Sequence, residues 1–485
     1  MDSVVGSGGG VAGGGVVEPR AAGRPRPGEN GEGAGGRSSR IARLREHPQA
    51  ERWARALIVL CTLVLLAATL EIVLDAAVGH SALIPKQPEI AGWLSGIGVR
   101  LGYRTFLIAL LSFTVAYAVL LGLARRISKR WAIVLVGILQ LVVFVGPVLI
   151  STDVFSYIAY ARMGVEHAIN PYTHGPIAIV HDPVYQYVGK DWKHVATAYG
   201  PLYTLLSYPL APLGLKGALW GMKLEALLAG AGTLALTWRC ARVREINPVG
   251  ALLAVGANPL WVIYGLGGAH NDLVMTLFMM AAVSFSLAGR SAGRLEILGS
   301  PIGGRDAPAA ASVVAGALVK ATVAALLPFM ILSRRKLAPI LGTLAALVLA
   351  ALVGYAVFGI HGIDLVAALN RDAAFVSTDS FPTELAHLVG KPGVFPIDHD
   401  LLRGGLVLIV VYLLWRTWRG YDWVAASGWT LLAISVTSTW LLPWYTLWSL
   451  PLAVVVRDRR LLAATLVVQA LFIVHQMAPL LVPVQ

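Results

Sequence analysis

The chain has 485 residues, of which 57% are hydrophobic and only 13% are charged, and its mean hydropathy is +0.70. A water-soluble protein of this length cannot bury so much apolar surface, so most of the chain must lie in lipid. The formal net charge of +13 comes mainly from Lys and Arg in short segments between apolar runs, which is the positive-inside pattern of membrane proteins. No exposed basic groove is apparent, so nucleic acid is not an expected partner.

The first 50 residues differ from the rest of the chain. Residues 1–50 are rich in Gly, Ala, Pro and Arg and end in a basic stretch. This composition predicts a disordered basic cytoplasmic tail whose end lies against anionic lipid. Residues 51–485 are predicted to form a single polytopic transmembrane domain.

Cysteine and metal-ligand patterns are nearly absent. Cys61 falls inside the first apolar run and Cys240 lies beside a basic loop, so no disulfide is predicted. No CxxC or HExxH spacing occurs, so no metal site and no cofactor are predicted, and dependence on a divalent metal is left open.

Apolar runs of spanning length set the fold class. They cover residues 56–77, 104–123, 131–150, 217–238, 248–266, 271–289, 337–359, 404–418, 422–440, 443–456 and 460–480. All basic clusters between these runs can be cytoplasmic only if two further segments do not cross completely. These are Tyr199–Gly214, which contains three prolines, and Ala309–Leu332, which carries Lys320 near its middle. Both are predicted to be re-entrant or broken helices.

This orientation places most of the reactive side chains on the outer side of the membrane. The large outer loops are predicted at 151–198 and 360–403. Nine of the eleven histidines lie in or beside outer loops, at positions 80, 167, 174, 181, 194, 270, 361, 387 and 399. No inner loop is long enough for a Rossmann-type nucleotide domain, so the activated group is expected to arrive on a lipid.

Asp153 directly follows an apolar run and is the candidate catalytic base. It would remove a proton from an incoming hydroxyl at the bilayer edge. The alternative is a simple helix cap, since Ser151 and Thr152 also favour that position. The stretch Val154–His167 after it predicts a helix lying in the membrane interface, and the alternative is that this helix serves only in packing.

Two further segments are candidates for binding a phosphate or a sugar. In NPLWVIYGLGGAHND, the side chains of His270, Asn271 and Asp272 follow a Gly267-Gly268 turn, and the alternative is a capped turn. Lys320 lies in an apolar segment, where a lysine indicates function by default, with snorkelling to the interface as the alternative.

The outer loops add weaker candidates. Arg371 and Arg403 are rival phosphate ligands, and Lys391 is weaker. The cluster 398–400 is expected to be a solvated loop rather than a cation or sugar site. The aromatic residues between 440 and 448 are expected first to form an interface belt and only second a surface for sugar stacking.

Several short motifs carry a resemblance over residues 104–480. They are DVFSY (153–157), NPY (170–172), YGPLY (199–203), NPL (258–260), GGAHND (267–272) and VKA (319–321). In this order they resemble the actinobacterial polyprenol-phosphate-mannose-dependent α-1,6-mannosyltransferases, which belong to the type C (GT-C) glycosyltransferase superfamily. The resemblance implies an all-α polytopic membrane protein, with a GT-C-type bundle of about 11–13 transmembrane helices, interfacial or re-entrant helices, and outer loops.

The resemblance also implies an activity. The enzyme would transfer mannose from a polyprenyl phosphate to a lipid-linked glycan acceptor, a mannan of the lipomannan type, outside the cell membrane. Asp153 matches the family's base. Lys320, Arg371, Arg403, His270, Asn271 and Asp272 would bind the donor or its phosphate. Tyr157, Glu166, Asn170, Tyr172 and Tyr199 would contact substrate.

The chain departs from the superfamily pattern at two points. The paired acidic motif is absent, because Thr152 and Val154 flank Asp153, and this puts metal dependence in doubt. Asp153 also follows the third apolar run rather than the first, so the two N-terminal spans look like an addition.

Two alternatives remain. A polytopic transporter or lipid-linked-sugar flippase also needs many spans, broken helices and an intramembrane lysine, but it would place polar residues near the bilayer midplane between repeats. A transferase of the same kind using arabinose or glucose is equally compatible with these residues.

Overall fold

The computed structural model describes residues 48–78, 97–99, 102–288, 295–297, 300–302, 305–364 and 375–477. Contacts divide the chain into two units, Met1–Trp53 and Ala54–Gln485. The predicted tail lies outside the described residues except for residues 48–50, which begin the first described helix. Everything below concerns the second unit.

Helices make up most of the described residues. The α-helices are α2 (Pro48–Ala76), α3 (Tyr103–Gly122), α4 (Lys129–Val145), α5 (Asp153–Glu166), α6 (Pro201–Ser207), α7 (Gly214–Val243), α8 (Pro248–Gly256), α9 (Asp272–Leu287), α10 (Asp306–Ala317), α11 (Leu326–Arg334), α12 (Leu337–Phe358), α14 (Phe381–Leu388), α15 (Pro396–Trp418), α16 (Trp423–Thr437), α17 (Leu450–Ala453) and α18 (Arg459–Gln476). The 3₁₀ helices are η1 (Ala124–Arg126), η2 (Pro176–Ile179), η3 (Tyr185–Tyr187), η4 (Lys190–Trp192), η5 (Tyr208–Leu213), η7 (Ala321–Ala325), η8 (Gly359–Asp364) and η9 (Pro443–Leu447), and η6 (Leu260–Leu266) is a π-helix. Two three-residue strands, β1 (Leu295–Ile297) and β2 (Ser300–Ile302), pair antiparallel.

The predicted class, an all-α polytopic membrane protein, is confirmed. Among the described residues four helices are long and apolar enough to cross a membrane, at Gln49–Ala76, Tyr103–Gly122, Pro201–Val243 and Leu337–His361. A fifth candidate is the pair α8 and η6, which is bent by 49°. Other expected runs form shorter or interrupted helices, such as 443–456, which contains Pro443 and Pro451 and folds as η9 and α17.

Both segments that were expected to be broken are broken. Tyr199–Gly214 folds as α6 followed by the 3₁₀ turn η5, because its prolines interrupt regular α-helical hydrogen bonding. Ala309–Leu332 divides at Lys320, whose extended backbone separates α10 from η7. The break lets the Lys320 side chain leave the helix and face a cavity.

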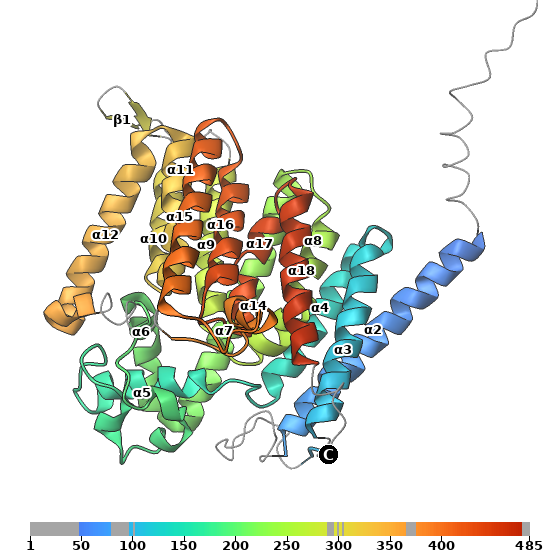
Figure 1. The fold of residues 1–485 in the computed structure, drawn as a ribbon, viewed down its shortest axis with the longest axis horizontal. Helices are drawn as coiled ribbons and strands as arrows, with labels where there is room; N and C mark the ends of the chain where they lie inside the picture. Colours follow the sequence, from blue (N-terminus) through green and yellow to red (C-terminus); the bar gives the residue numbers. More distant parts are fainter. Residues whose placement is uncertain are drawn as a thin grey trace, which may run out of the picture. The chain divides into compact units, whose positions relative to one another are not determined.

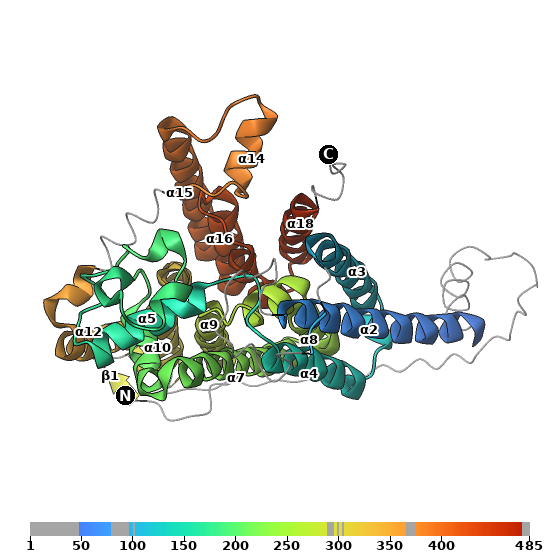
Figure 2. The same ribbon diagram turned by 90° about the horizontal axis from the view of Figure 1, so that it is seen from below.

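Helices α9 and α10 lie at the centre of the packing. α10 packs between α9 and α12, α7 packs along α9, and α15 packs against α16 (Figure 1). α14 lies on α16, as Figure 2 shows from below. The outward face of α12 carries exposed Leu344, Val348 and Leu352. An apolar face of this extent is suited to contact with lipid.

The basic turns meet at one end of the bundle, the upper end in Figure 1. Arg244 after α7 pairs with Asp422 before α16, and Arg457 before α18 binds Glu245 at 3.0 Å. Arg335 before α12 donates to the backbone carbonyl of Trp418 at the end of α15. Helices α5, α6 and α14 lie at the opposite end (Figure 1). The fold therefore separates a basic end from the end that carries Asp153.

Candidate active site

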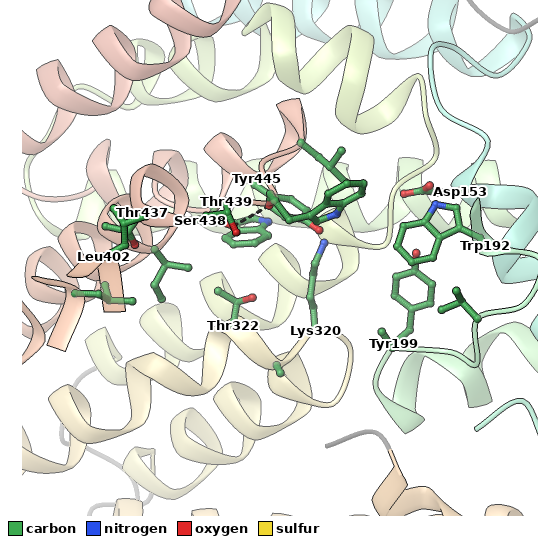
Figure 3. A pocket seen from close by; sticks show the side chains of 18 of the residues that line it. Asp153, Trp192, Tyr199, Lys320, Thr322, Leu402, Thr437, Ser438, Thr439 and Tyr445 are labelled. Atoms are coloured by element: carbon green, nitrogen blue, oxygen red, sulfur yellow. Dashed lines mark hydrogen bonds between the residues drawn. The ribbon is translucent and has the colours of Figure 1, made fainter. Parts of the chain in front are cut away.

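A cavity of about 330 Å³ brings together several of the residues singled out from the sequence (Figure 3). Its wall combines the start of α5, the loop before α6, the break before η7, the first half of α15 and the segment from α16 to η9. The lining includes Asp153, Ser156, Tyr160, Trp192, Tyr199, Lys320, Thr322, His399, Arg403, Thr437, Ser438, Thr439, Trp440, Tyr445 and Trp448. In Figure 3, Asp153, Trp192 and Tyr199 gather at one side, Leu402 and Thr437 at the other, and Lys320 extends between them.

Asp153 is held at the cavity wall by its own short approach segment. The backbone N–H of Leu149 donates to the carbonyl of Gly267 at 2.8 Å, which ties this segment to the turn before α9. Ile150 then adopts φ = +67°, a strained value for a β-branched residue. The Ser151 hydroxyl accepts from the Asp153 backbone N–H at 3.1 Å. At this helix start the Ser151 hydroxyl, and not the Asp153 carboxylate, accepts from the backbone.

The environment makes Asp153 a stronger base than an ordinary aspartate. Its side chain is 17% exposed. Burial, opposed in part by the charge of Lys320 and reinforced by that of Asp272, raises the pKa of Asp153 to about 6. The carboxylate is therefore ionised at neutral pH and has a proton affinity suited to general-base chemistry.

Behind Asp153 lies a buried polar group formed by His270, Tyr157 and Asn271. His270 Nδ1 is 3.6 Å from Asp153 Oδ2 and 3.4 Å from the Tyr157 hydroxyl, which also reaches Asn271 Oδ1 at 3.5 Å. The imidazole stacks on Trp444, with ring centroids 3.6 Å apart. Burial, followed by the charge of Lys320, lowers the pKa of His270 well below its usual range, so the ring is neutral.

The neutral ring has a preferred tautomer. Among the described residues, His270 Nε2 is buried without a hydrogen-bond partner. A buried N–H without a partner costs about 1–3 kcal/mol, so the proton belongs on Nδ1, the nitrogen that faces Asp153. The Nδ1–H then lies 3.4 Å from the Tyr157 hydroxyl and 3.6 Å from the Asp153 carboxylate.

Lys320 is fixed by a second carboxylate and two aromatic rings. Its ammonium lies 2.9 and 3.1 Å from the two carboxylate oxygens of Asp272. Trp448 Nε1 donates to the same carboxylate. The ammonium lies 4.2 Å from the centroid of the Tyr445 ring and 5.1 Å from that of Trp448. Asp272 thus holds Lys320 in place, and the lysine keeps one face toward the cavity.

Backbone contacts at Gly200 join the two sides of the site. The N–H of Gly200 donates to the carbonyl of Val319 at 3.1 Å, and the N–H of Leu202 donates to that of Leu318 at 3.0 Å. A Cβ on Gly200 would collide with the backbone of Leu318, so the close approach requires glycine. This contact places Tyr199 and Lys320 next to the same cavity.

Some predicted site residues line the cavity and others support it. Asp153, Tyr199, Lys320 and Arg403 line it. His270, Asn271 and Asp272 are at most 1% exposed and lie behind the wall, so the structure does not bring them into contact with the cavity. Tyr157 is also behind the wall, packed edge-on against Tyr199 with centroids 4.8 Å apart.

The remaining predicted contacts lie away from the cavity. Tyr172 donates to the carbonyl of Tyr199 at 3.0 Å, and Asn170 Nδ2 donates to that of Phe358 at 2.9 Å. Both bonds position backbone. Glu166 is exposed at the C-terminal end of α5. Arg371 lies outside the described residues.

Several lining residues were missed or given another role by the sequence. Trp192 was not singled out, and it packs edge-on against Trp440, with centroids 6.1 Å apart. The aromatic residues between 440 and 448 were expected first to form an interface belt and second a surface for sugar stacking; Trp440, Tyr445 and Trp448 line the cavity, and Trp444 stacks on His270. The sequence did indicate that these aromatic residues line a cavity. An interface belt does not require a proline and polar residues interleaved with the aromatic ones, as they are in TSTWLLPWYTLW (437–448).

No group of three or more His, Cys, Asp or Glu side chains in the described part of the chain is arranged to hold a metal ion. In the cluster 398–400, Asp398 binds Lys391 at 3.0 Å and Asp400 lies 3.7 Å from Arg403. These acids are balanced by bases of the same region.

A helical membrane protein whose cavity joins a basic carboxylate, an ammonium group and aromatic walls has the features of a membrane-embedded glycosyltransferase. Residues 51–336 match the family described as alpha-(1→6)-mannopyranosyltransferase, N-terminal domain, and residues 403–479 match the MptB C-terminal domain. The chain belongs to the alpha-(1→6)-mannopyranosyltransferase family, which confirms the resemblance drawn from the short motifs.

Curated relatives carry the same description. The chain is 27% identical over 406 residues to alpha-(1→6)-mannopyranosyltransferase A of Mycobacterium tuberculosis, covering 76% of this chain and 75% of the relative. It is 28% identical over 260 residues to the protein of the same name from Corynebacterium glutamicum, covering 53% of this chain and 48% of that protein. No solved structure matches the chain. The protein is thus a mannosyltransferase of the membrane.

Proposed function

We propose that this mannosyltransferase uses a polyprenyl-phosphate mannose donor, extends a lipid-linked α-1,6-mannan of the lipomannan type, and does so on the outer side of the cell membrane. The proposal depends on one observation: Asp153, a carboxylate of raised pKa, and the ammonium of Lys320 line the same cavity. Glycosyl transfer from a phosphate needs a base for the proton of the acceptor hydroxyl and a cation for the charge on the departing phosphate. A carboxylate and an ammonium in one cavity supply both.

The chemistry follows from these two groups. Asp153 accepts the proton of the acceptor's 6-hydroxyl while that oxygen attacks the anomeric carbon of mannose. The bond from that carbon to the phosphate oxygen breaks, and the phosphate leaves with the electron pair. Attack from the face opposite the phosphate inverts the anomeric centre, so a β-linked donor yields an α-linked product.

Lys320 would stabilise the negative charge that builds on the departing phosphate. Arg403 also lines the cavity, and its side chain is 62% exposed, so it can approach a phosphate that lies near the mouth. Asp272 binds the ammonium of Lys320, and Trp448 donates to Asp272, so the lysine side chain is held in one rotamer. This lowers the side-chain entropy lost when the donor phosphate binds.

Aromatic walls suit the sugars. Trp192, Tyr199, Trp440 and Tyr445 present ring surfaces to the cavity. The apolar lining, from Leu402 and Leu406 on α15 and Ile434 on α16, suits the first isoprene units of a lipid donor. A soluble nucleotide sugar would make no use of this apolar side.

The outer location is supported by the separation of charges along the bundle. The basic turns collect at the end opposite α5, and basic turns favour the cytoplasmic side. The cavity with Asp153 would then open toward the outer leaflet.

The central experiment reconstitutes the purified full-length protein in liposomes with a short mannan lipid acceptor. We expect label to pass from polyprenyl-phosphate [¹⁴C]mannose, and not from GDP-[¹⁴C]mannose, into a product whose new linkage is cleaved by an α-1,6-mannosidase. Transfer from the nucleotide sugar alone would overturn the donor assignment. Equal transfer of arabinose or glucose from the same lipid phosphate would overturn the sugar assignment, and movement of intact donor across the bilayer without transfer would favour the flippase.

Sidedness is tested separately with introduced cysteines. Cys61 and Cys240 are buried, so new exposed cysteines can be labelled selectively. A cysteine replacing exposed Ala178 should react with an impermeant maleimide applied to intact cells, whereas one replacing exposed Gly122 should react only after permeabilisation. The reverse pattern would place the cavity on the cytoplasmic side.

A further inference from the structure

A second, larger groove lies at the basic end of the same two helices that border the active cavity. It measures about 860 Å³ and runs between the second half of α15, the helix α16 and the turn before α18. Its lining consists of Ile409, Tyr412, Leu413, Arg416, Tyr421, Trp429, Leu432, Ala433, Val436, Arg457, Asp458, Arg459 and Arg460. None of these residues lines the active cavity.

One end of the groove is strongly cationic. Four arginines face a single acid there, Asp458. Arg457 is engaged at its exposed tip by Glu245 at 3.0 Å. Within the described part of the chain, Arg459 and Arg460 have no ion-pair partner. An anion bound here would meet an excess of guanidinium groups, which are suited to binding a phosphate through two hydrogen bonds at once.

The acid offsets only part of this charge, because one carboxylate stands against four arginines. Asp458 Oδ2 accepts from the Tyr421 hydroxyl and, at 3.0 Å, from Trp429 Nε1. Its Oδ1 accepts from the backbone N–H groups of Arg460 and Leu461 at 3.0 and 3.2 Å and so caps α18. These bonds fix the carboxylate in the wall of the groove, and none of them comes from an arginine side chain.

Arg416 marks the boundary between the polar and apolar parts. Its guanidinium donates to the Tyr412 hydroxyl at 2.9 Å and lies 4.6 Å from the centroid of the Tyr421 ring. Beyond it the groove is lined by side chains with only carbon atoms. These are Ile409, Leu413, Leu432 and Val436.

The depth of the groove in the membrane follows from the surface of α15. Trp415 and Trp418, both about half exposed, lie on the last turn of this helix with Arg416, and Arg419 follows directly as its C-cap. Aromatic and basic residues in such a band sit at the membrane–water interface. The arginines are thus level with lipid headgroups, and the apolar wall is level with acyl chains.

We propose that this groove binds one anionic glycerophospholipid, with its phosphate on Arg416, Arg459 and Arg460 and an acyl chain along the α15–α16 wall. A free phosphate would leave the apolar wall uncovered, and a zwitterionic lipid would bring its own cation to the arginines. The site is independent of the transfer chemistry, although it joins the two helices that also border the active cavity.

The test uses purified full-length protein in a non-ionic detergent and three probes. These are dioctanoyl phosphatidylglycerol, dioctanoyl phosphatidylcholine and glycerol phosphate, with binding measured by native mass spectrometry and by thermal shift. We expect one phosphatidylglycerol per protein, bound at least about tenfold more tightly than phosphatidylcholine, a difference of about 1.4 kcal/mol. Glycerol phosphate should neither saturate nor displace it at the same concentration.

Matched variants connect the binding to these side chains. The double substitution Arg416→Ala and Arg460→Ala should weaken phosphatidylglycerol binding about tenfold or more. Arg130→Ala removes an exposed arginine from another basic turn and should leave binding unchanged. If the double variant does not fold, the exposed single substitution Arg459→Gln replaces it. Equal affinity for both lipids, full competition by glycerol phosphate, or unchanged binding by every groove variant would each overturn the proposal.

Discussion

Two carboxylates near the two ends of α5 have opposite surroundings. Asp182 is buried and receives Arg162 Nε at 3.0 and 2.9 Å, His167 Nε2 at 2.8 Å and the backbone N–H of Val184 at 3.0 Å. Burial alone would raise the pKa of Asp182, but the hydrogen bonds from His167, Val184 and Arg162 together hold it below its usual range. Asp153 at the other end lines the cavity, has the Ser151 hydroxyl and His270 Nδ1 (3.6 Å) beside it, and has a pKa of about 6.

The difference separates a structural acid from a reactive one. Both carboxylate oxygens of Asp182 already accept hydrogen bonds from neighbouring groups of the protein, so no lone pair is left to accept a substrate proton. Asp153 keeps an oxygen toward the cavity and is less stabilised as an anion. A carboxylate in that state gains most by taking a proton, which is what the proposed reaction requires.

The largest expected effect is that of Asp153→Asn. The amide keeps the shape of the side chain but cannot accept the proton, so transfer should fall about 10³-fold, within the 10²–10⁴ range for a general base. The measurement is the initial rate of [¹⁴C]mannose transfer in liposomes. A variant that retains more than a tenth of the activity would exclude Asp153 as the base.

The same variant carries its own folding control. Because the pKa of Asp153 is raised in the folded protein, its ionisation removes stability as the pH rises through about 6. The neutral amide avoids that cost, so Asp153→Asn should melt at the same temperature as the wild type or higher at pH 7. A lower melting temperature would mean that the lost activity reflects misfolding.

The second effect concerns Lys320→Met, which removes the ammonium but keeps the length of the side chain. The rate should fall about 10²-fold, because one preformed stabiliser of the leaving phosphate is lost. The substitution also leaves Asp272 buried without its partner, so the single variant should be less stable. The double variant Lys320→Met with Asp272→Asn should recover stability without recovering activity. Recovery of both would make Lys320 a structural residue.

The third effect falls on stability rather than on catalysis. Asp182→Ala leaves the partly buried Arg162 without its carboxylate, and breaking a fully buried pair costs about 3–5 kcal/mol, which is the upper limit for this one. The melting temperature should drop clearly, while the protein that stays folded should transfer mannose at an unchanged rate per molecule. A loss of turnover at full folding would remove the contrast between the two acids.

Much of the fold followed from simple patterns. Prolines located the break in Tyr199–Gly214, and a lysine in an apolar run located the break at Lys320, because each disrupts a continuous buried helix. The lengths of the spans were harder to predict, because an apolar run records burial in lipid or protein without showing where the helix ends. The run 404–418 is part of a longer helix, α15, that begins at Pro396.

The site could be predicted in part. Asp153 and Lys320 stood out because each places a charge beside apolar sequence, where burial is costly. The role of the residues in GGAHND could not be predicted, since sequence does not show that Asp272 faces Lys320 or that His270 lies behind Asp153. Trp192 was missed because a tryptophan in a predicted outer loop has no local pattern that distinguishes a cavity wall from an interface.

The fourth effect is a pH dependence that belongs to Asp153 alone. The base must be ionised, so kcat/KM should be constant above about pH 7 and should fall about tenfold for each unit below pH 6. Asp182, whose pKa is held low, stays ionised through this range and contributes nothing to the profile. Rates measured from pH 4.5 to 8 test this, and a profile that stays flat to pH 5 would contradict the raised pKa of Asp153.

The smallest effect is expected at Glu166, which the sequence placed among the substrate contacts. This side chain is exposed at the C-terminal end of α5, next to the Asp182 cluster, and does not line the cavity. Glu166→Gln should change kcat/KM by less than about twofold and leave the melting temperature unchanged, as is usual for an exposed substitution. The matched comparison is Tyr199→Phe, which alters a cavity wall and should raise KM while preserving the fold. If Glu166→Gln instead raised KM for the acceptor as Tyr199→Phe does, the glycan would have to extend along the whole of α5, and both ends of the helix would contact substrate.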